Sequence, residues 1–267
     1  MFKRILIANR GEIAVRIIRT CREMNVETVA VYSRADKDSL HVKMATSAIC
    51  IGQDSPADSY LNMKNIISAA LISGAEAIHP GFGFLSENSE FARLCKENGI
   101  VFIGPDADVI DKLGNKSAAR ECVMKNGVPV VPGSKRPLES AADAQKEADR
   151  IGYPVLLKAS CGGGGRGIRR ADKREEVESR YCEARSEAMA CFGNDEMYIE
   201  KCVMHPRHIE IQILADEFGN VIHLGERDCS MQRKHQKLME ESPAMFITDD
   251  MRRKMGKAAV DAARAAG

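Results

Sequence analysis

The chain has 267 residues, of which 44% are hydrophobic and 29% charged, so it is long enough to bury a core and to form two compact units. Its 39 Lys and Arg residues nearly balance 38 Asp and Glu residues, and the formal net charge is +1. With so small a net charge, no overall electrostatic attraction draws the protein to nucleic acid or to a membrane surface. Any anion-binding site must therefore come from a local group of basic residues.

Over the first part of the chain, short apolar runs alternate with helical patterns, which is typical of βαβ units around a parallel sheet. The expected strands are residues 5–8, 29–32, 48–51, 75–78 and 101–103. The expected helices are residues 12–24, 61–73 and 90–98. Ligands of such sheets bind near the carboxyl ends of the strands, so the loops that begin at Asn9 and His79 are candidate site loops.

The composition changes near Gly114, where two short helices, residues 108–113 and 116–126, lead into the Pro-rich segment 128–133. We place a domain boundary there, between residues 1–114 and 115–267. The second part begins as an α+β unit. Its elements are a helix at 141–151, a strand at 154–158, a glycine loop, a charged helix at 174–190 and a strand at 197–201.

Residues 208–214 alternate strictly between polar and apolar side chains. Three isoleucines (Ile209, Ile211 and Ile213) face one side, and His208, Glu210 and Gln212 face the other. This pattern predicts a strand with one face in a core and one in a polar cleft. A turn at 217–220 leads to a strand at 221–224, which predicts a hairpin, and Thr248 begins an Ala-rich helix that runs to residue 267.

The nine cysteines have no CxxC pair and no recurring spacing, which predicts free thiols in a reducing compartment. The first apolar run is too short for a signal-peptide core, and no stretch approaches the roughly 20 apolar residues that span a bilayer. We expect a cytoplasmic protein, although an organellar protein that has lost a transit peptide would share these features.

Four consecutive glycines, residues 162–165, follow the strand that ends at Lys158. Each ordered glycine costs about 0.5–1 kcal/mol relative to alanine, so the run is either a flexible linker or a loop whose backbone N–H groups close over phosphates. Its position between a strand and a helix, and the adjacent Arg166, favour the loop. It is not a Walker A loop, because no Lys-Ser or Lys-Thr follows the glycines. The first βα turn has Gly11 as its only glycine and lacks the dinucleotide-binding pattern GxGxxG, which disfavours a dehydrogenase.

Two further segments carry candidate chemistry. Lys158 stands where an ammonium could reach nucleotide phosphates, whereas Lys116 alone is an ordinary solvated charge. Residues 200–203 either present backbone groups to an adenine edge or simply end a strand. Residues 226–237 are either a charged, solvated loop or a local anion site, because they concentrate five basic side chains, Arg227, Arg233, Lys234, His235 and Lys237.

Five segments in order resemble biotin carboxylase motifs: residues 7–14, 79–88, the glycine loop, 206–212 and 226–237. The resemblance covers essentially the whole chain. It implies an α/β fold in which a parallel-sheet pre-ATP-grasp domain precedes an α+β ATP-grasp domain. It also implies an enzyme that uses ATP and bicarbonate to carboxylate biotin through carboxyphosphate.

The resemblance further implies roles for individual residues. It implies ATP contacts for Lys116, Lys158, Glu200, Lys201, Cys202, Val203, His208, Gln232 and His235. Gly164 and Gly165 would lie in a mobile lid, about residues 131–203, over the phosphates. Lys237 matches the family's bicarbonate-binding lysine. For His79 we expect a hydrogen-bonded structural histidine beside Pro80. The family commonly has glycine at the position of Cys161, where a positive φ would strain the loop.

The implied cofactors are ATP and Mg²⁺ or Mn²⁺, with biotin as the carrier-bound substrate. The implied partners are biotin carboxyl carrier protein, bicarbonate and a second copy of the chain, but neither nucleic acid nor a membrane. The family's metal-binding carboxylates, its glutamate base and an arginine lie beyond residue 267, so we assign no metal ligand here. We therefore expect an incomplete ATP-grasp domain with an exposed apolar edge, and little or no carboxylating activity from this chain alone.

Among carboxylases, we favour the acetyl-CoA carboxylase subunit because the chain starts directly with its first strand. Pyruvate, propionyl-CoA and methylcrotonyl-CoA carboxylases share the motifs and remain alternatives. A non-catalytic ATP-binding fragment is the alternative from another class, while residues 227–237 argue against a carbamoyl phosphate synthetase.

Overall fold

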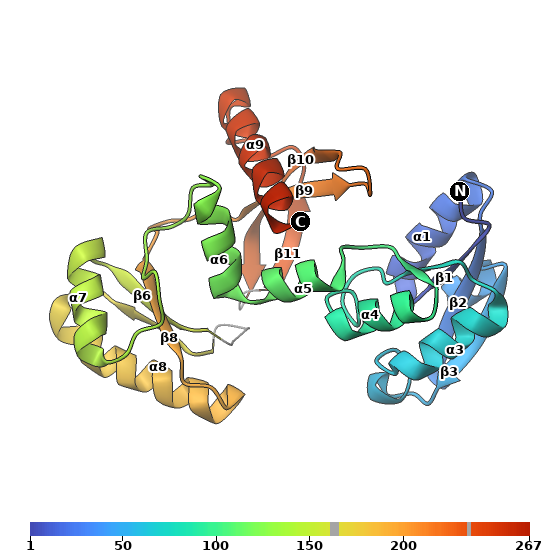
Figure 1. Cartoon of the computed structure of the whole chain (residues 1–267), viewed down its shortest axis with the longest axis horizontal. Coiled ribbons are helices and arrows are strands. Elements are labelled where there is room, and N and C mark those ends of the chain that lie inside the picture. Colours follow the sequence, from blue (N-terminus) through green and yellow to red (C-terminus); the bar gives the residue numbers. More distant parts are fainter. Residues whose placement is uncertain (161–165, 234–235) are drawn as a thin grey trace. The chain divides into compact units, whose positions relative to one another are not determined.

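The computed structural model describes residues 1–160, 166–233 and 236–267, apart from the side chains of residues 116 and 117. The chain divides into two compact units, Met1–Gly114 and Asn115–Gly267 (Figure 1). The first is a parallel α/β unit, and the second contains two antiparallel sheets, so the α/β class with a parallel-sheet domain before an α+β domain is confirmed.

The first unit is built on a five-stranded sheet with the order β3-β2-β1-β4-β5, in which every neighbouring pair is parallel. This order places the carboxyl ends of β1 and β4 side by side, with Ile7 opposite His79. The strands are β1 (Arg4–Ile7), β2 (Glu27–Ser33), β3 (Ser47–Gly52), β4 (Ala77–His79) and β5 (Val101–Phe102).

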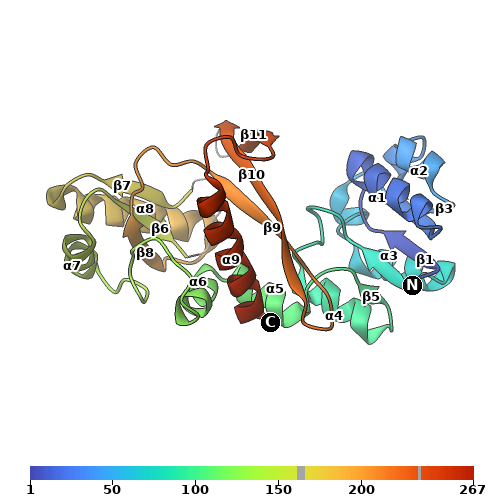
Figure 2. The same ribbon diagram turned by 90° about the horizontal axis from the view of Figure 1, so that it is seen from above.

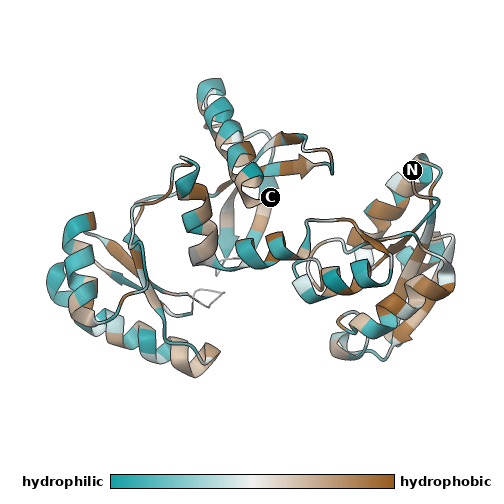
Figure 3. Ribbon diagram, viewed as in Figure 1, coloured by the Kyte–Doolittle hydropathy of each residue, from teal (hydrophilic) through white to brown (hydrophobic). Residues whose placement is uncertain are grey.

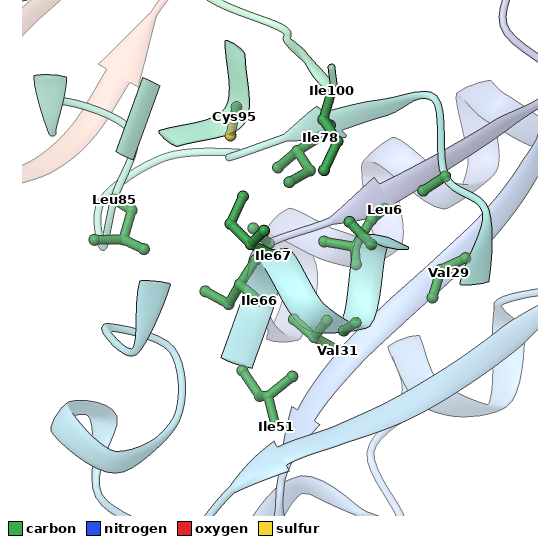
Figure 4. Packing of buried hydrophobic residues seen from close by; sticks show 14 of the residues in the cluster. Leu6, Val29, Val31, Ile51, Ile66, Ile67, Ile78, Leu85, Cys95 and Ile100 are labelled. Atoms are coloured by element: carbon green, nitrogen blue, oxygen red, sulfur yellow. The ribbon is translucent and has the colours of Figure 1, made fainter. Parts of the chain in front are cut away.

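Helices cover both faces of this sheet. On one face, Leu6, Val29 and Val31 pack with α3 and α4 residues such as Ile66 and Phe91 in one core cluster (Figure 4). The other face packs on α1 through a separate cluster. The helices are α1 (Gly11–Glu23), α2 (Leu40–Met44), α3 (Met63–Ser73), α4 (Ser89–Glu97) and α5 (Ala107–Gly114), with short 3₁₀ turns at Arg34–Asp36 and Pro56–Asp58. Figure 3 shows brown, hydrophobic colouring on strands of this sheet and in bands on the neighbouring helices.

The loop after β4 depends on a glycine at position 81. Gly81 has φ +69°, and a Cβ there would lie 2.7 Å from Asn9 Nδ2 and 2.8 Å from Ile13 Cγ2. The same Asn9 amide donates to the carbonyls of Pro80 (2.8 Å) and Phe82 (2.9 Å), so it has little freedom to move.

We expect Gly81→Ala to lower the free energy of unfolding by about 1–3 kcal/mol beyond the cost of the positive φ, because the methyl group would displace a bonded amide. Gly99→Ala is a matched control: its φ is +68°, and no heavy atom lies within 4 Å of the added Cβ. Urea unfolding of both variants measures the difference. Equal losses would show that packing against Asn9 contributes nothing.

The second unit begins with α6 (Lys116–Lys125) and a three-stranded antiparallel sheet with the order β7-β6-β8. Helices α7 and α8 cover one face, where small residues such as Ala148 and Ala184 allow close contact with Val155 and Leu157. The elements are α7 (Ala141–Ile151), β6 (Val155–Ala159), β7 (Ile168–Ala171), a 3₁₀ turn at Arg174–Glu176, α8 (Val177–Phe192) and β8 (Met197–Lys201). We refer to the β7-β6-β8 sheet as the lid sheet.

A second antiparallel sheet, with the order β11-β10-β9, follows. Its strands are β9 (Ile209–Ala215), β10 (Val221–Arg233) and β11 (Gln236–Glu241), and α9 (Asp249–Ala266) runs beside it (Figure 2). Thr248 accepts a hydrogen bond from the Met251 N–H (3.2 Å), which confirms the predicted helix start. Gly256 gives α9 room on the isoleucine face of β9, because a Cβ there would lie 2.5 Å from the ring of His223, the partner of Ile213.

This sheet contains a longer strand than the sequence predicted. The strand predicted at 221–224 continues to Arg233, so residues 226–233 are not a solvated loop. The segment is a strand in which Glu226, Asp228 and Cys229 are buried. On this sheet, Leu214, Ile222 and Leu224 are each more than half exposed.

Two chain-wide expectations can be compared with the described residues. The eight cysteines among them are all free, and Cys161 lies outside them. Within the same part of the chain, no helix combines the length and apolar character needed to cross a membrane.

Candidate functional site

Several predicted site residues fall outside the part of the chain that the structure describes. These are Gly164, Gly165 and His235, together with Cys161 of the glycine loop. Lys116 is the first residue of α6, but its side chain is likewise not described. The remaining candidates lie on the lid sheet and on the β9–β11 sheet.

On the lid sheet, Lys158 and Glu200 lie on the face opposite α7 and α8. The alternation of β6 buries Val155 and Leu157 and turns Lys158 to the other side. Leu156 pairs with Glu200 on the neighbouring strand, so Glu200 lies diagonally across from Lys158. The Lys158 ammonium donates to Glu200 Oε1, and both side chains remain about one-third exposed (34% and 27%). The sequence placed both residues at strand ends but did not predict their ion pair.

Lys201 uses its side chain differently from Lys158. Its ammonium donates to the carbonyls of Gly152 (3.0 Å) and Tyr153 (2.6 Å), at the carboxyl end of α7. Backbone N–H groups of Lys201 and Cys202 donate to Pro132 (2.7 Å) and Pro154 (3.0 Å). The segment is therefore anchored from both sides before it reaches Val203, which is exposed.

On the β9–β11 sheet, His208 and Gln232 form a pair. Gln232 Nε2 lies 3.0 Å from His208 Nδ1 and also donates to the Cys229 carbonyl (3.0 Å). Because an amide nitrogen can only donate, Nδ1 is the acceptor in this contact. His208 Nε2 lies 3.8 Å from Glu210 Oε2, so the histidine is oriented between an amide and a carboxylate.

Glu210 holds two cations, one on each carboxylate oxygen. Arg227 Nε donates to Oε1 (2.7 Å), and the Lys237 ammonium donates to Oε2. The hydrogen bond from Lys237, followed by that from Arg227, outweighs desolvation and lowers the pKa of Glu210 to about 2. The same contact raises the pKa of Lys237. Both groups are therefore charged at neutral pH, and the ammonium has donors left for another acceptor.

Comparisons with known proteins decide the family. Residues 1–110 match the family described as "Biotin carboxylase, N-terminal domain", and residues 115–267 match "Carbamoyl-phosphate synthase L chain, ATP binding domain". Biotin carboxylase 1 of Bacillus subtilis is 56% identical over 267 residues, which is all of this chain and 59% of that protein. The chain belongs to the biotin carboxylase family. It spans about three-fifths of that relative's length, within its amino-terminal part.

Solved biotin carboxylase structures show the same fold. The Campylobacter jejuni biotin carboxylase in a β,γ-ATP complex has a TM-score of 0.92 at 51% identity, covering 100% of this chain and 60% of that one. The biotin carboxylase domain dimer of the Hydrogenobacter thermophilus 2-oxoglutarate carboxylase, in complex with MgADP, ADP and bicarbonate, has a TM-score of 0.88 at 51% identity. The match covers 100% of this chain and 59% of that one.

In this chain, a buried carboxylate that the sequence did not single out supports the candidate site. Asp228 accepts from Arg207 Nη1 (3.3 Å) and from the Ser230 N–H (2.9 Å). The Ser230 hydroxyl in turn accepts from the His208 N–H (3.0 Å). His208 is thus tied to β10 through its backbone as well as through Gln232. In the sequence, the one sign of this role is that Asp228 is an acidic residue within a basic segment.

The first unit of the chain holds a second polar cluster at the carboxyl end of its sheet. Arg10 donates to both oxygens of Asp36 (2.6 Å each), and the Tyr60 hydroxyl donates to the same carboxylate (2.7 Å). Nearby, His79 Nδ1 accepts the Gly81 N–H (3.0 Å). Burial, together with the charge of Arg16, lowers the pKa of His79 to about 4, so this histidine is neutral and hydrogen-bonded at pH 7.

Proposed function

We propose that this chain is the nucleotide- and bicarbonate-binding part of a biotin carboxylase, which carboxylates biotin on its carrier protein with ATP and bicarbonate through carboxyphosphate. One observation carries the proposal: Glu210 fixes the Lys237 ammonium on the polar face of the β9–β11 sheet, beside the His208 and Gln232 pair. Its membership of the biotin carboxylase family supports the same role.

In this proposal, the nucleotide lies between the open face of the lid sheet and the polar face of the β9–β11 sheet. The residues proposed to hold it are Lys116, Lys158, Gly164, Gly165, Glu200, Lys201, Cys202, Val203, His208, Gln232 and His235. Lys158 would keep one N–H on Glu200 and give another to a phosphate oxygen, since an ammonium has three donors. Because Lys201 anchors its ammonium to Gly152 and Tyr153, we propose that its backbone, not its side chain, faces the base.

The attack of bicarbonate on the γ-phosphate brings several negative charges together, and cations must stabilise them. Lys237 supplies one such charge to bicarbonate. Family relatives include a structure with MgADP, but the described carboxylates do not fit a Mg²⁺ or Mn²⁺ site. Glu200 and Glu210 are both paired with lysines, and the cluster of Glu210, Glu240 and Cys229 includes a thiol, whereas these ions prefer oxygen ligands. We therefore assign no metal ligand.

Four finer assignments remain part of the proposal. We place the reaction in the first half-reaction of acetyl-CoA carboxylase, in the cytoplasm, with biotin carboxyl carrier protein as partner and a homodimer as the assembly. The second candidate is that this chain belongs to a different carboxylase. It is favoured by the similarity to a solved biotin carboxylase domain dimer from a 2-oxoglutarate carboxylase. Assaying the chain with the carrier proteins of each system separates these two candidates.

The test combines ATP binding with turnover. We expect Lys158→Met to weaken ATP binding about 10- to 100-fold, because one charge-assisted hydrogen bond to a phosphate is lost. Lys254→Met is the control, since Lys254 is an exposed lysine paired with Asp250 on α9. Isothermal titration with ATP and Mg²⁺ measures binding, and phosphate release with bicarbonate measures turnover.

Equal affinities of the two variants would contradict the proposed nucleotide site. The expected low activity of the 267-residue chain alone is tested in the same assay: steady bicarbonate-dependent ATP cleavage would contradict it.

A further inference from the structure

Four charged side chains, Lys237, Glu210, Arg227 and Glu240, are linked by ion pairs on the polar face of the β9–β11 sheet. Two of them, Arg227 and Glu240, have no role in the proposed function. Arg227 donates from Nε to Glu210 Oε1 (2.7 Å) and forms a second ion pair with Glu240 Oε2 (3.5 Å). Lys237 donates to the other oxygen of Glu210. Two cations and two carboxylates cancel, so the network is neutral.

Arg227 is the member that keeps the two carboxylates together. Oxygens of Glu210 and Glu240 and the Sγ of Cys229 all lie within 4.8 Å of one another, a separation at which like charges repel strongly unless a cation lies between them. Arg227 contacts both carboxylates, and its Nη1 also donates to Gln212 Oε1 (3.0 Å). Its guanidinium is therefore held in place by three partners.

This arrangement also fixes the direction of Lys237. Since Arg227 occupies Oε1 of Glu210, only Oε2 is left to the ammonium. Among the described residues, the Lys237 ammonium donates to Glu210 alone, and its other N–H groups are available for an incoming anion. The Lys237 side chain is 37% exposed, so an anion can approach it from solvent.

We propose that Arg227 and Glu240 set the electrostatic potential at Lys237 and thereby its affinity for a small oxyanion, Arg227 raising that affinity and Glu240 lowering it. Both are positioning residues, because they act through Glu210 and Lys237 and do not touch the anion. The inference rests on the proposed function, in which bicarbonate binds at Lys237.

The sign of each effect follows from the charge balance. Arg227→Met leaves the network with one excess negative charge, which repels an anion. Glu240→Gln leaves one excess positive charge, which attracts an anion. The double variant is neutral again and restores the original balance, which a merely structural role of either residue would not do.

The first measurement is the affinity of the full chain for ¹³C-bicarbonate, titrated by NMR. We expect about tenfold weaker binding for Arg227→Met and about tenfold tighter binding for Glu240→Gln, the effect of one unit charge in a partly exposed site. The double variant should bind as the unaltered chain does, and both shifts should shrink in high salt.

The second measurement needs no substrate. The rate at which acetic anhydride modifies Lys237, followed by mass spectrometry against pH, reports the pKa of its ammonium. Removal of a neighbouring cation stabilises the charged form, so Arg227→Met should raise this pKa, while Glu240→Gln should lower it. The matched controls are Arg253→Met and Asp250→Asn, an exposed pair on α9, and neither should change the profile.

These outcomes distinguish the charge control of Lys237 from the proposed function. Opposite shifts in the pKa of Lys237 without any bicarbonate binding would support the charge control and refute the proposed function. Bicarbonate binding that neither variant alters would refute the inference and leave the proposed function intact. Shifts of the same sign, or no restoration in the double variant, would also overturn it. If Arg227→Met does not fold, Glu240→Gln alone must still tighten binding.

Discussion

Arg252→Met is expected to lower the free energy of unfolding of the second unit by about 3–5 kcal/mol, because it leaves a buried carboxylate without its cation. Glu226, in β10, has a side chain only 1% exposed. Its Oε1 accepts from Arg252 Nε (2.8 Å) and from the Ala244 N–H (3.1 Å). Burial alone would raise the pKa of Glu226, but these two donors hold it below its ordinary value, so the group is ionised.

A second substitution shows whether the uncompensated charge is the cause. In the Arg252→Met background, Glu226→Gln should recover part of the lost stability, since a neutral amide is less costly to bury and its oxygen still accepts from Ala244. Arg253→Met, next along α9 but exposed, should cost less than about 0.5 kcal/mol. Guanidinium unfolding followed by circular dichroism gives the values. A loss from Arg252→Met as small as that of the control would contradict the argument.

The first unit was largely predictable from sequence because buried parallel strands appear as continuous apolar runs. The run at 29–32, for instance, lies inside β2, Glu27–Ser33. Helix α2 was missed because Leu40–Met44 is too short to show a helical period. Strand β7 was missed because Arg169 and Arg170 occupy half of it and obscure any alternation.

The long strand β10 shows why the second unit was harder. Beyond residue 224 its buried positions include Glu226 and Asp228, which a pattern search assigns to solvent. Their burial depends on Arg252 and Arg207, which are distant in sequence, so no local window contains both partners. Register shifts between His223 and Glu226 further break the two-residue period.

The contacts between the described candidate site residues were not predictable from the sequence. Alternation placed Glu210 on the polar face of its strand, yet its cations lie on two other strands whose register includes bulges. Lys237 was expected to bind bicarbonate, and nothing in the sequence indicated that its ammonium also contacts a carboxylate. Contacts of this kind follow from strand pairing, which residue patterns do not specify.

The stability of the first unit is expected to fall as the pH drops from about 6.5 toward 4, before most carboxylates titrate. Burial lowers the pKa of His79 to about 4, from an ordinary value of 6.5. Burial also lowers the pKa of His41, whose Nδ1 is buried without a hydrogen-bond partner among the described residues. Between these pH values the two histidines are protonated in the unfolded chain but remain neutral in the folded chain. The free energy of unfolding therefore decreases as the pH falls.

For His79 alone, the pKa difference corresponds to a loss of up to about 3 kcal/mol by pH 4. His79→Asn should remove this contribution, because an amide oxygen can replace Nδ1 as acceptor for the Gly81 N–H and does not titrate in this range. Urea unfolding at pH 7 and pH 5 measures the change, with His205→Asn as the control, since His205 is exposed. A steep decline that persists unchanged in His79→Asn would place the acid sensitivity elsewhere. A flatter decline only in that variant would show that a neutral His79 at the end of β4 stabilises the fold.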